Sequence, residues 1–247
     1  MSKQAKEYFN LKRRVLCVTD SNVPEKYSKS ILEQCETGYL FTFESGEENK
    51  SFDTLRNILS CLVENGFTRS DCIVAVGGGV VGDIAGFASS IFMRGIDFYN
   101  VPTTLLSQLD SSIGGKTAID FDGIKNIVGS FKQPKGVIGD IDVLSTLPKR
   151  HISNGLCESV KMAMTSDEKL FEMFEKGEYK DNLQEVIIAS LKIKKSVVEQ
   201  DEKEANLRKI LNFGHTVGHA IESESMGRLY HGECVGLGML AVTGAKV

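Results

Sequence analysis

Hydrophobic residues in the first 150 positions alternate between short apolar runs and stretches with helical spacing. Strand-like runs occur at 14–19, 40–43, 72–76 and 98–102, with a weaker one at 137–140. The apolar side chains of residues 52–64 recur about every 3.6 residues, which predicts a helix. Residues 83–92 follow a glycine-rich stretch and also predict a helix. Strands that alternate with helices predict an α/β fold, a parallel sheet with helices on both faces.

The pattern changes after Thr146-Leu147-Pro148. Residues 151–226 show helical spacing without a strand pattern, most clearly at 181–200. Residues 235–242 predict a last helix that stops at Val247 without a capping signal. We therefore predict a Rossmann-like α/β domain at 1–148 and an all-helical domain at 149–247, the second of them incomplete.

Composition narrows the class of protein. The chain has 247 residues, 41% of them hydrophobic, which suits a globular fold. A formal net charge of -4 argues against a broad nucleic-acid-binding face. No apolar run is long enough to span a bilayer, and the first 14 residues lack a signal-peptide core. Six scattered cysteines favour free thiols in a reducing compartment. We expect a cytoplasmic protein that binds neither nucleic acid nor membrane.

A glycine-rich stretch follows the apolar run at 72–76. Gly77, Gly79 and Gly82 match G-x-G-x-x-G, in which bare backbone at a helix N-terminus approaches a dinucleotide pyrophosphate. A tight turn or close helix packing would explain the glycines equally well. The acidic residue expected about 20 positions later is not convincing, because Asp97 precedes a strand and does not end one.

A second stretch, Gly114-Gly115-Lys116-Thr117, resembles a phosphate-binding loop only superficially. The leading glycine of that loop is replaced by Asp110, so we reject the assignment. Lys116, Lys125 and Asn126 still suit a bound phosphate or carboxylate. Solvated surface lysines are the alternative interpretation.

Three of the four histidines lie within seventeen residues. His215 and His219 are four apart and share a helix face, and His231 follows. The pair lacks the glutamate of H-E-x-x-H, so a zinc protease is disfavoured. Glu158 lies on an earlier helix. Two histidines and a carboxylate with an open position make a catalytic zinc site, but spacing alone does not decide which histidines bind.

Charged residues lead into this histidine segment. Lys194, Asp201, Glu204 and Arg208 are spaced along predicted polar helix faces, and the two cations, Lys194 and Arg208, suit a bound anion near the histidines. The alternative is a set of surface charges in which Glu204 and Arg208 pair at i,i+4.

Motif-like stretches follow one another along the chain at 77–90, Phe92-Met93-Arg94-Gly95, 101–117, 125–134, 147–150, 158–161, 208–222 and His231-Gly232-Glu233. Taken in order, these stretches resemble the 3-dehydroquinate synthase family and its sugar-phosphate cyclase relatives. The sequence departs from the family pattern at Asp120, where the family usually has asparagine. We also expect the chain to lack the family's further C-terminal helices, which carry another substrate-binding lysine.

The resemblance implies roles for individual residues. Zn²⁺, or alternatively Co²⁺, would bind Glu158, His215 and His231, while His219 would contact the substrate. Glu204 would accept a proton, and Arg94 would reach the neighbouring subunit of a homodimer. The implied NAD site comprises Asp20, Asn22, Glu47, Lys50, Gly78, Gly79, Asp83, Thr103, Thr104, Lys125, Thr146 and Asn154. The implied substrate site comprises Asp110, Lys116, Asn126, Lys161, Lys194, Arg208 and Asn212.

The implied reaction is that of the shikimate pathway of aromatic amino acid biosynthesis, from a seven-carbon keto-acid sugar phosphate (DAHP) to 3-dehydroquinate and phosphate. NAD oxidises a ring hydroxyl, phosphate is eliminated, the same NADH reduces the ketone, and an aldol step closes the ring. The alternatives are a related sugar-phosphate cyclase, a metal-dependent polyol dehydrogenase and an inactive NAD-binding module.

Overall fold

The computed structural model describes residues 4–244 and divides into two compact units. One contains the chain up to Thr103 together with 115–145, and the other contains 104–114 together with the chain from Thr146 onward. The single division predicted at 148 therefore misplaces residues 104–114. They group with the helical unit because the short π-helix Ser107–Ser111 packs against two of its helices, α5 (Lys149–Ser166) and α7 (Leu183–Gln200).

The first unit is built on a five-stranded parallel sheet, as the alternating pattern predicts. The weak run at 137–140 forms only a two-residue edge strand at 136–137, so that prediction is wrong in extent. In spatial order the strands are β2 (Thr37–Phe43), β1 (Arg14–Asp20), β3 (Cys72–Gly77), β4 (Asp97–Pro102) and β7 (Gly136–Val137).

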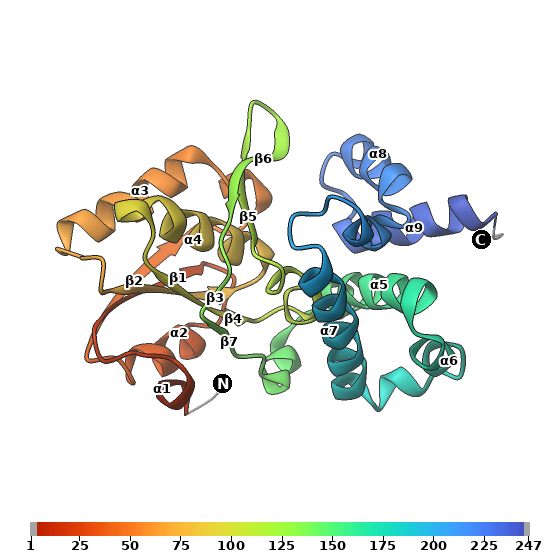
Figure 1. Cartoon of the computed structure of the whole chain (residues 1–247), viewed down its shortest axis with the longest axis horizontal. Helices are drawn as coiled ribbons and strands as arrows, with labels where there is room; N and C mark the ends of the chain where they lie inside the picture. The colour runs from red at the N-terminus through yellow and green to blue at the C-terminus, as the bar shows by residue number, and fades with distance from the viewer. Residues whose placement is uncertain (1–3, 245–247) are drawn as a thin grey trace. The chain divides into compact units, whose positions relative to one another are not determined.

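Helices cover both faces of this sheet (Figure 1). Leu16 and Val18 of β1 point into the main core with α3 and α4, and the alternate positions face the α2 side. The helix predicted at 83–92 begins earlier, at Gly79, so its first glycines are helical. The helices are α1 (Ala5–Tyr8), α2 (Glu25–Leu32), α3 (Phe52–Glu64) and α4 (Gly79–Ile91), with short 3-10 turns at Glu47–Asn49, Phe92–Arg94 and Ile141–Thr146.

An antiparallel hairpin, β5 (Lys116–Phe121) and β6 (Ile124–Phe131), also belongs to this unit and is not predicted by the sequence. β6 is largely exposed, including Ile124 and Ile127 at 56% and 57%, whereas β5 buries Thr117 and Ile119. Because β6 has no buried face and β5 has only two fully buried positions, the alternation that identifies a strand is weak in this hairpin.

The described residues of the second unit form helices and connecting turns, with no strand among them, as predicted. The last helix ends at Gly244 in a left-handed conformation, with its N–H donating to the carbonyl of Leu240, so the prediction of an uncapped helix is wrong. Val247 lies outside the described residues. Besides α5 and α7, the unit contains α6 (Glu168–Glu175), α8 (His215–Ser225), α9 (His231–Thr243) and 3-10 turns at Glu178–Lys180 and Leu207–Asn212.

All six cysteines are free thiols, as expected, although Cys35, Cys61 and Cys157 are only partly buried. Between residues 4 and 244, no helix combines the length and apolarity needed to cross a membrane.

Candidate active site

The carboxyl ends of β1, β3 and β4 lie along one edge of the parallel sheet. The chain runs from β1 outward to β2 and then returns to β3 on the other side of β1. Parallel sheets bind ligands at such a reversal, beyond the carboxyl ends of the strands. Asp20 ends β1, Gly77 ends β3, and Thr103 follows β4 with its N–H donating to the Gly77 carbonyl at 2.9 Å.

The glycines at this edge serve close packing as well as an open backbone. A Cβ on Gly77 would meet Val81 at 2.5 Å, and one on Gly82 would meet the Asn100 amide at 3.1 Å. Gly78 precedes the first turn of α4, whose N–H groups are available to an anion. Asp97 begins β4 and pairs with Arg13 at 2.8 Å, so it lies at the opposite edge of the sheet. The sequence argument against Asp97 is therefore correct.

Asp20 is positioned by the turn that follows β1. Its Oδ1 accepts the backbone N–H groups of Asn22 at 2.9 Å and Val23 at 3.2 Å. Burial raises the pKa of Asp20, although these hydrogen bonds oppose the shift. Both of these hydrogen bonds use Oδ1. A carboxylate near the carboxyl end of a strand in such a sheet is suited to accept hydrogen bonds from the ribose hydroxyls of a dinucleotide.

Three residues of the predicted site meet the buried ammonium group of a fourth, Lys50. Lys50 is 4% exposed, and its Nζ donates to Asp83 Oδ2 at 2.6 Å and to Asn126 Oδ1. Glu47 Oε1 lies 3.8 Å from the same nitrogen. The structure thus brings Asn126, predicted for the substrate, together with three residues predicted for NAD.

The remaining predicted NAD residues are divided between the units. Lys125 lies exposed on β6 of the first unit, whereas Thr104, Thr146 and Asn154 belong to the second. Thr104 Oγ1 lies 2.9 Å from Ser107 Oγ. Asn154 Oδ1 accepts the N–H of Gly232 at 2.7 Å, a contact that anchors the start of α9 on α5.

The second unit places Glu158 opposite two histidines. Glu158 Oε1 lies 3.8 Å from His215 Nε2 and 3.6 Å from His231 Nε2. The opposite ring nitrogens have other neighbours, since His215 Nδ1 lies 3.3 Å from the Phe213 carbonyl and His231 Nδ1 lies 3.0 Å from Glu222 Oε2. Each imidazole therefore turns its Nε2 toward Glu158.

The chemistry of this donor set fits a divalent metal. Glu158 is 1% exposed and its Oε1 has no hydrogen-bond partner among the described residues. Its Oε2 accepts a hydrogen bond from Lys161, which is also buried. A buried carboxylate oxygen without a partner is unfavourable unless a ligand satisfies it. Burial lowers the pKa of His215 to about 4, although Glu158 opposes the shift, so its imidazole is neutral at physiological pH and able to bind a metal.

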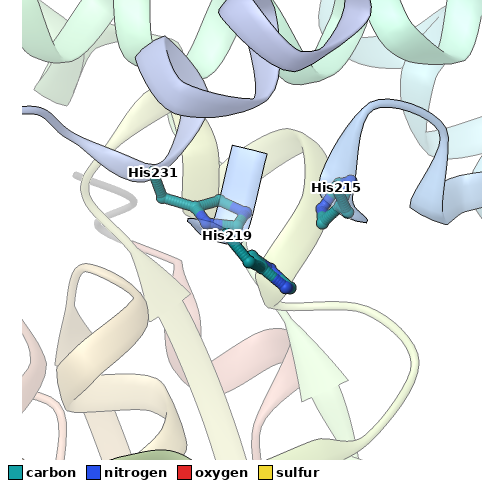
Figure 2. Close-up of side chains that lie close together, drawn as sticks. All are labelled: His215, His219 and His231. Carbon is teal, nitrogen blue, oxygen red and sulfur yellow. The ribbon is translucent and has the colours of Figure 1, made fainter. Parts of the chain in front are cut away.

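A set of three histidines is the competing metal site. Ligand atoms of His215, His219 and His231 all lie within 4.8 Å of one another. Figure 2 shows these side chains gathered at one place, two from α8 and one from the first position of α9. Glu158 is the more deeply buried donor, and His219 is exposed.

Cations gather in the same unit. Lys194 Nζ donates to Asp110 Oδ1 at 2.7 Å and to the Asp110 carbonyl at 2.6 Å. Burial lowers the pKa of Lys194, as do Lys161 and Arg208, while Asp110 opposes the shift. Burial would raise the pKa of Asp110, but Lys194 and Lys161 outweigh it and lower that pKa. An anionic ligand would complement this excess of buried positive charge.

Arg208 does not take part in the surface pair considered from the sequence. It is 3% exposed, and its Nη1 donates to the carbonyls of Gly114 and Glu202 at 3.1 and 2.6 Å. Glu204 has φ 60° and lies outside any helix, so the i,i+4 alternative and the predicted helix face are both wrong here. Glu204 Oε1 instead accepts a hydrogen bond from Asn212 Nδ2 at 2.7 Å.

The sequence analysis missed the residues that orient His231. Glu222 supports Nδ1, and Arg150 makes two 2.7 Å hydrogen bonds to Glu233 in the first turn of α9. Glu233 Oε2 also accepts the N–H of Tyr230 at 2.8 Å, which ties its side chain to the start of α9. The available signals were the glutamate three residues after His219 and the glutamate two residues after His231.

Comparisons with known proteins agree along nearly the whole chain. The family model for the N-terminal part of 3-dehydroquinate synthase matches residues 40–154. The family model for the C-terminal part matches residues 155–246. The 3-dehydroquinate synthase of Acetivibrio thermocellus is 47% identical over 241 residues, covering 92% of this chain and 66% of that protein.

Two solved structures of other enzymes share both the fold and more than a quarter of their aligned residues with this chain. One is 2-deoxy-scyllo-inosose synthase complexed with carbaglucose-6-phosphate, NAD⁺ and Co²⁺, with a TM-score of 0.85 and 29% identity. The other is the 2-epi-5-epi-valiolone synthase of Streptomyces hygroscopicus with NAD⁺ and Zn²⁺ bound, with a TM-score of 0.87 and 28% identity. They cover 96% and 93% of this chain and 68% of each of theirs. The chain thus spans about two thirds of the length of these relatives, and it belongs to the 3-dehydroquinate synthase family.

Proposed function

We propose that the chain carries the 3-dehydroquinate synthase reaction, converting DAHP to 3-dehydroquinate and phosphate. The observation that carries the proposal is the buried, unpartnered Oε1 of Glu158, which faces two imidazole nitrogens beside Lys161. A metal and an anionic substrate are the two ligands that such a site needs. The metal- and NAD-bound cyclases of the same fold support both cofactors.

Glu158, His215 and His231 would hold the metal, and the glycine edge with Asp20 would hold NAD. When bound, zinc would polarise a substrate hydroxyl, and NAD would take up its hydride and return it to the product. No net oxidation occurs, so one NAD serves every turnover.

The chain's own side chains would bind the anionic groups and move protons. Lys161, Lys194 and Arg208 would neutralise the carboxylate and phosphate of DAHP, because each is a buried cation. Each now donates to an acceptor within the chain, and the bound anion would replace that acceptor or share the cation with it. Glu204 would accept a proton on the carboxylate that Asn212 already orients. Burial, and then repulsion from Lys161 and Arg208, lowers the pKa of Lys194, and binding of the anion would offset that repulsion.

A homodimer is part of this proposal. Arg94 is exposed at φ 68°, and no other residue between 4 and 244 pairs with its guanidinium. The β5–β6 hairpin exposes Phe121, Ile124, Ile127 and Phe131, an apolar surface suited to a second copy. Arg94 would then serve the phosphate group in the neighbouring subunit.

The test is release of phosphate from DAHP by the metal-stripped protein after Zn²⁺ and catalytic NAD are added. We expect several turnovers per NAD without accumulation of NADH. Accumulating NADH would favour a dehydrogenase, and intact NAD binding without phosphate release would favour an inactive module. Either result contradicts the proposal.

The ligand assignment has its own test by zinc titration. His231→Ala should abolish tight zinc binding, whereas His219→Ala should keep it, because His219 is not in the proposed ligand set. Equal loss in both variants would favour the three-histidine site.

A further inference from the structure

The buried ammonium of Lys50 depends on acceptors from three separate segments. Asp83 is on α4, Glu47 is in a 3-10 turn, and Asn126 is on β6. Burial lowers the pKa of Lys50, but Asp83 and Glu47 outweigh it, so the group stays charged. A buried charge of this kind requires that its acceptors stay in place.

Asn126 reaches Lys50 from a strained backbone. Its φ is 56°, a left-handed conformation that costs asparagine less than most residues but is still less favourable than for glycine, and that is uncommon within a strand. A backbone contact supports this conformation, since the N–H of Asn126 donates to Asp120 Oδ1 at 2.8 Å. The register of the hairpin also shifts between Ile119 and Phe121, on either side of Asp120.

Asp120 contacts Lys50 directly as well. Its backbone N–H donates to the Lys50 carbonyl at 2.8 Å. The same residue therefore ties the main chain of Lys50 to the hairpin and fixes the asparagine whose oxygen meets the Lys50 ammonium.

We propose that Asp120 is a positioning residue for the NAD site. By accepting the N–H of Asn126 it keeps that residue left-handed, with its amide oxygen on Lys50, and so holds Lys50 beside Asp83. Without the carboxylate, Asn126 loses the contact that offsets its strain and its oxygen leaves Lys50. The inference rests on the proposed role of Lys50 in binding NAD.

NAD affinity, measured by isothermal titration, tests the proposal. Asp120→Ala should weaken binding about tenfold, the loss typical of one hydrogen bond with a charged partner. Asp120→Asn keeps an acceptor oxygen and should stay within about threefold of the wild type. The matched control is Asp122→Asn, which removes one exposed charge two residues away, also at positive φ, and should leave affinity unchanged. Equal losses in Asp120→Ala and Asp122→Asn would overturn the proposal.

A double-mutant cycle separates positioning from general stability. Asn126→Gly adopts φ 56° without strain but lacks the amide oxygen. If Asp120 acts through Asn126, adding Asp120→Ala to Asn126→Gly should weaken NAD binding no further. Additive losses would refute the positioning role.

An NAD-independent measurement separates the two proposals. Hydrogen exchange at the Asn126 N–H, followed by NMR, should be slow in the wild type and in Asp120→Asn and fast in Asp120→Ala. Fast exchange in the wild type refutes the role of Asp120. Slow exchange without NAD binding by the wild type refutes the proposed function while supporting the Asp120 contact.

Discussion

The substitution Glu158→Gln tests the proposed metal site and the buried ion pair beneath it at once. Glu158 is 1% exposed and Lys161 is 2% exposed, and they form an ion pair on adjacent turns of α5. The glutamine preserves shape and one acceptor oxygen but removes the charge. The change therefore acts on the pairing with Lys161 and on the affinity for a metal cation.

The structure sets the size of both effects. Removing one partner of a buried ion pair costs about 3–5 kcal/mol, and the acceptor that glutamine retains places this case near 3 kcal/mol. For a chain of this size that corresponds to a fall in Tm of about 6–12 °C in the metal-free protein. Loss of a direct ligand should weaken zinc binding more than about 100-fold, the upper range for residues that only support a ligand.

Thermal unfolding in chelator and competition for zinc with a chromophoric chelator give the two readouts. Lys161→Met is the matched control, because it breaks the same ion pair but leaves Glu158 in place. We expect Lys161→Met to lower the Tm comparably while zinc affinity stays within about tenfold of the wild type. If Glu158→Gln keeps its zinc affinity, or if both variants lose it equally, Glu158 is not a ligand.

Three further substitutions test the surroundings of this site. Gly114→Ala should lower stability by about 1–3 kcal/mol in urea unfolding and weaken binding of inorganic phosphate, because φ is 101° and the new Cβ would overlap the Arg208 guanidinium; an unchanged midpoint would contradict this. Glu222→Gln should weaken zinc binding about 10–100-fold, through the imidazole that Glu222 orients, and unchanged affinity would refute that role. Lys194→Met should lower the free energy of unfolding by about 2 kcal/mol at pH 7. The loss is smaller than for a fully buried pair because Asp110 stays partly accessible. The pKa of Asp110 is lowered in the folded protein, so its stabilising contribution is present above pH 3.8, its ordinary value, and is lost only in stronger acid. In the variant, which lacks the Lys194 ammonium, burial raises the pKa of Asp110. The difference in free energy of unfolding between variant and wild type should therefore narrow as pH falls toward 4, and a constant difference would be inconsistent with the pairing.

The α/β and helical halves could be read from the sequence because their patterns are local. The run at 72–76 is buried on both faces and α3 has one apolar side, so each segment's own spacing reports its structure. The same reasoning fails for the β5–β6 hairpin, because β6 is largely exposed and β5 is short, with only two fully buried positions. It also fails at 104–114, which groups with the helical unit although it lies between strands in the sequence.

The candidate site divides in the same way. The sequence by itself identified the chemistry, with three histidines, a glutamate and a set of cations in a family-like order. Only the tertiary structure decided which atoms meet: that Glu158 Oε1 faces two Nε2 atoms, and that Asn126 lies on Lys50. The physical reason is that residue type and spacing determine what a side chain can bind and which helix face it occupies. Contacts between residues 70 or more positions apart, such as Glu158 with His231, form only when separate elements pack together.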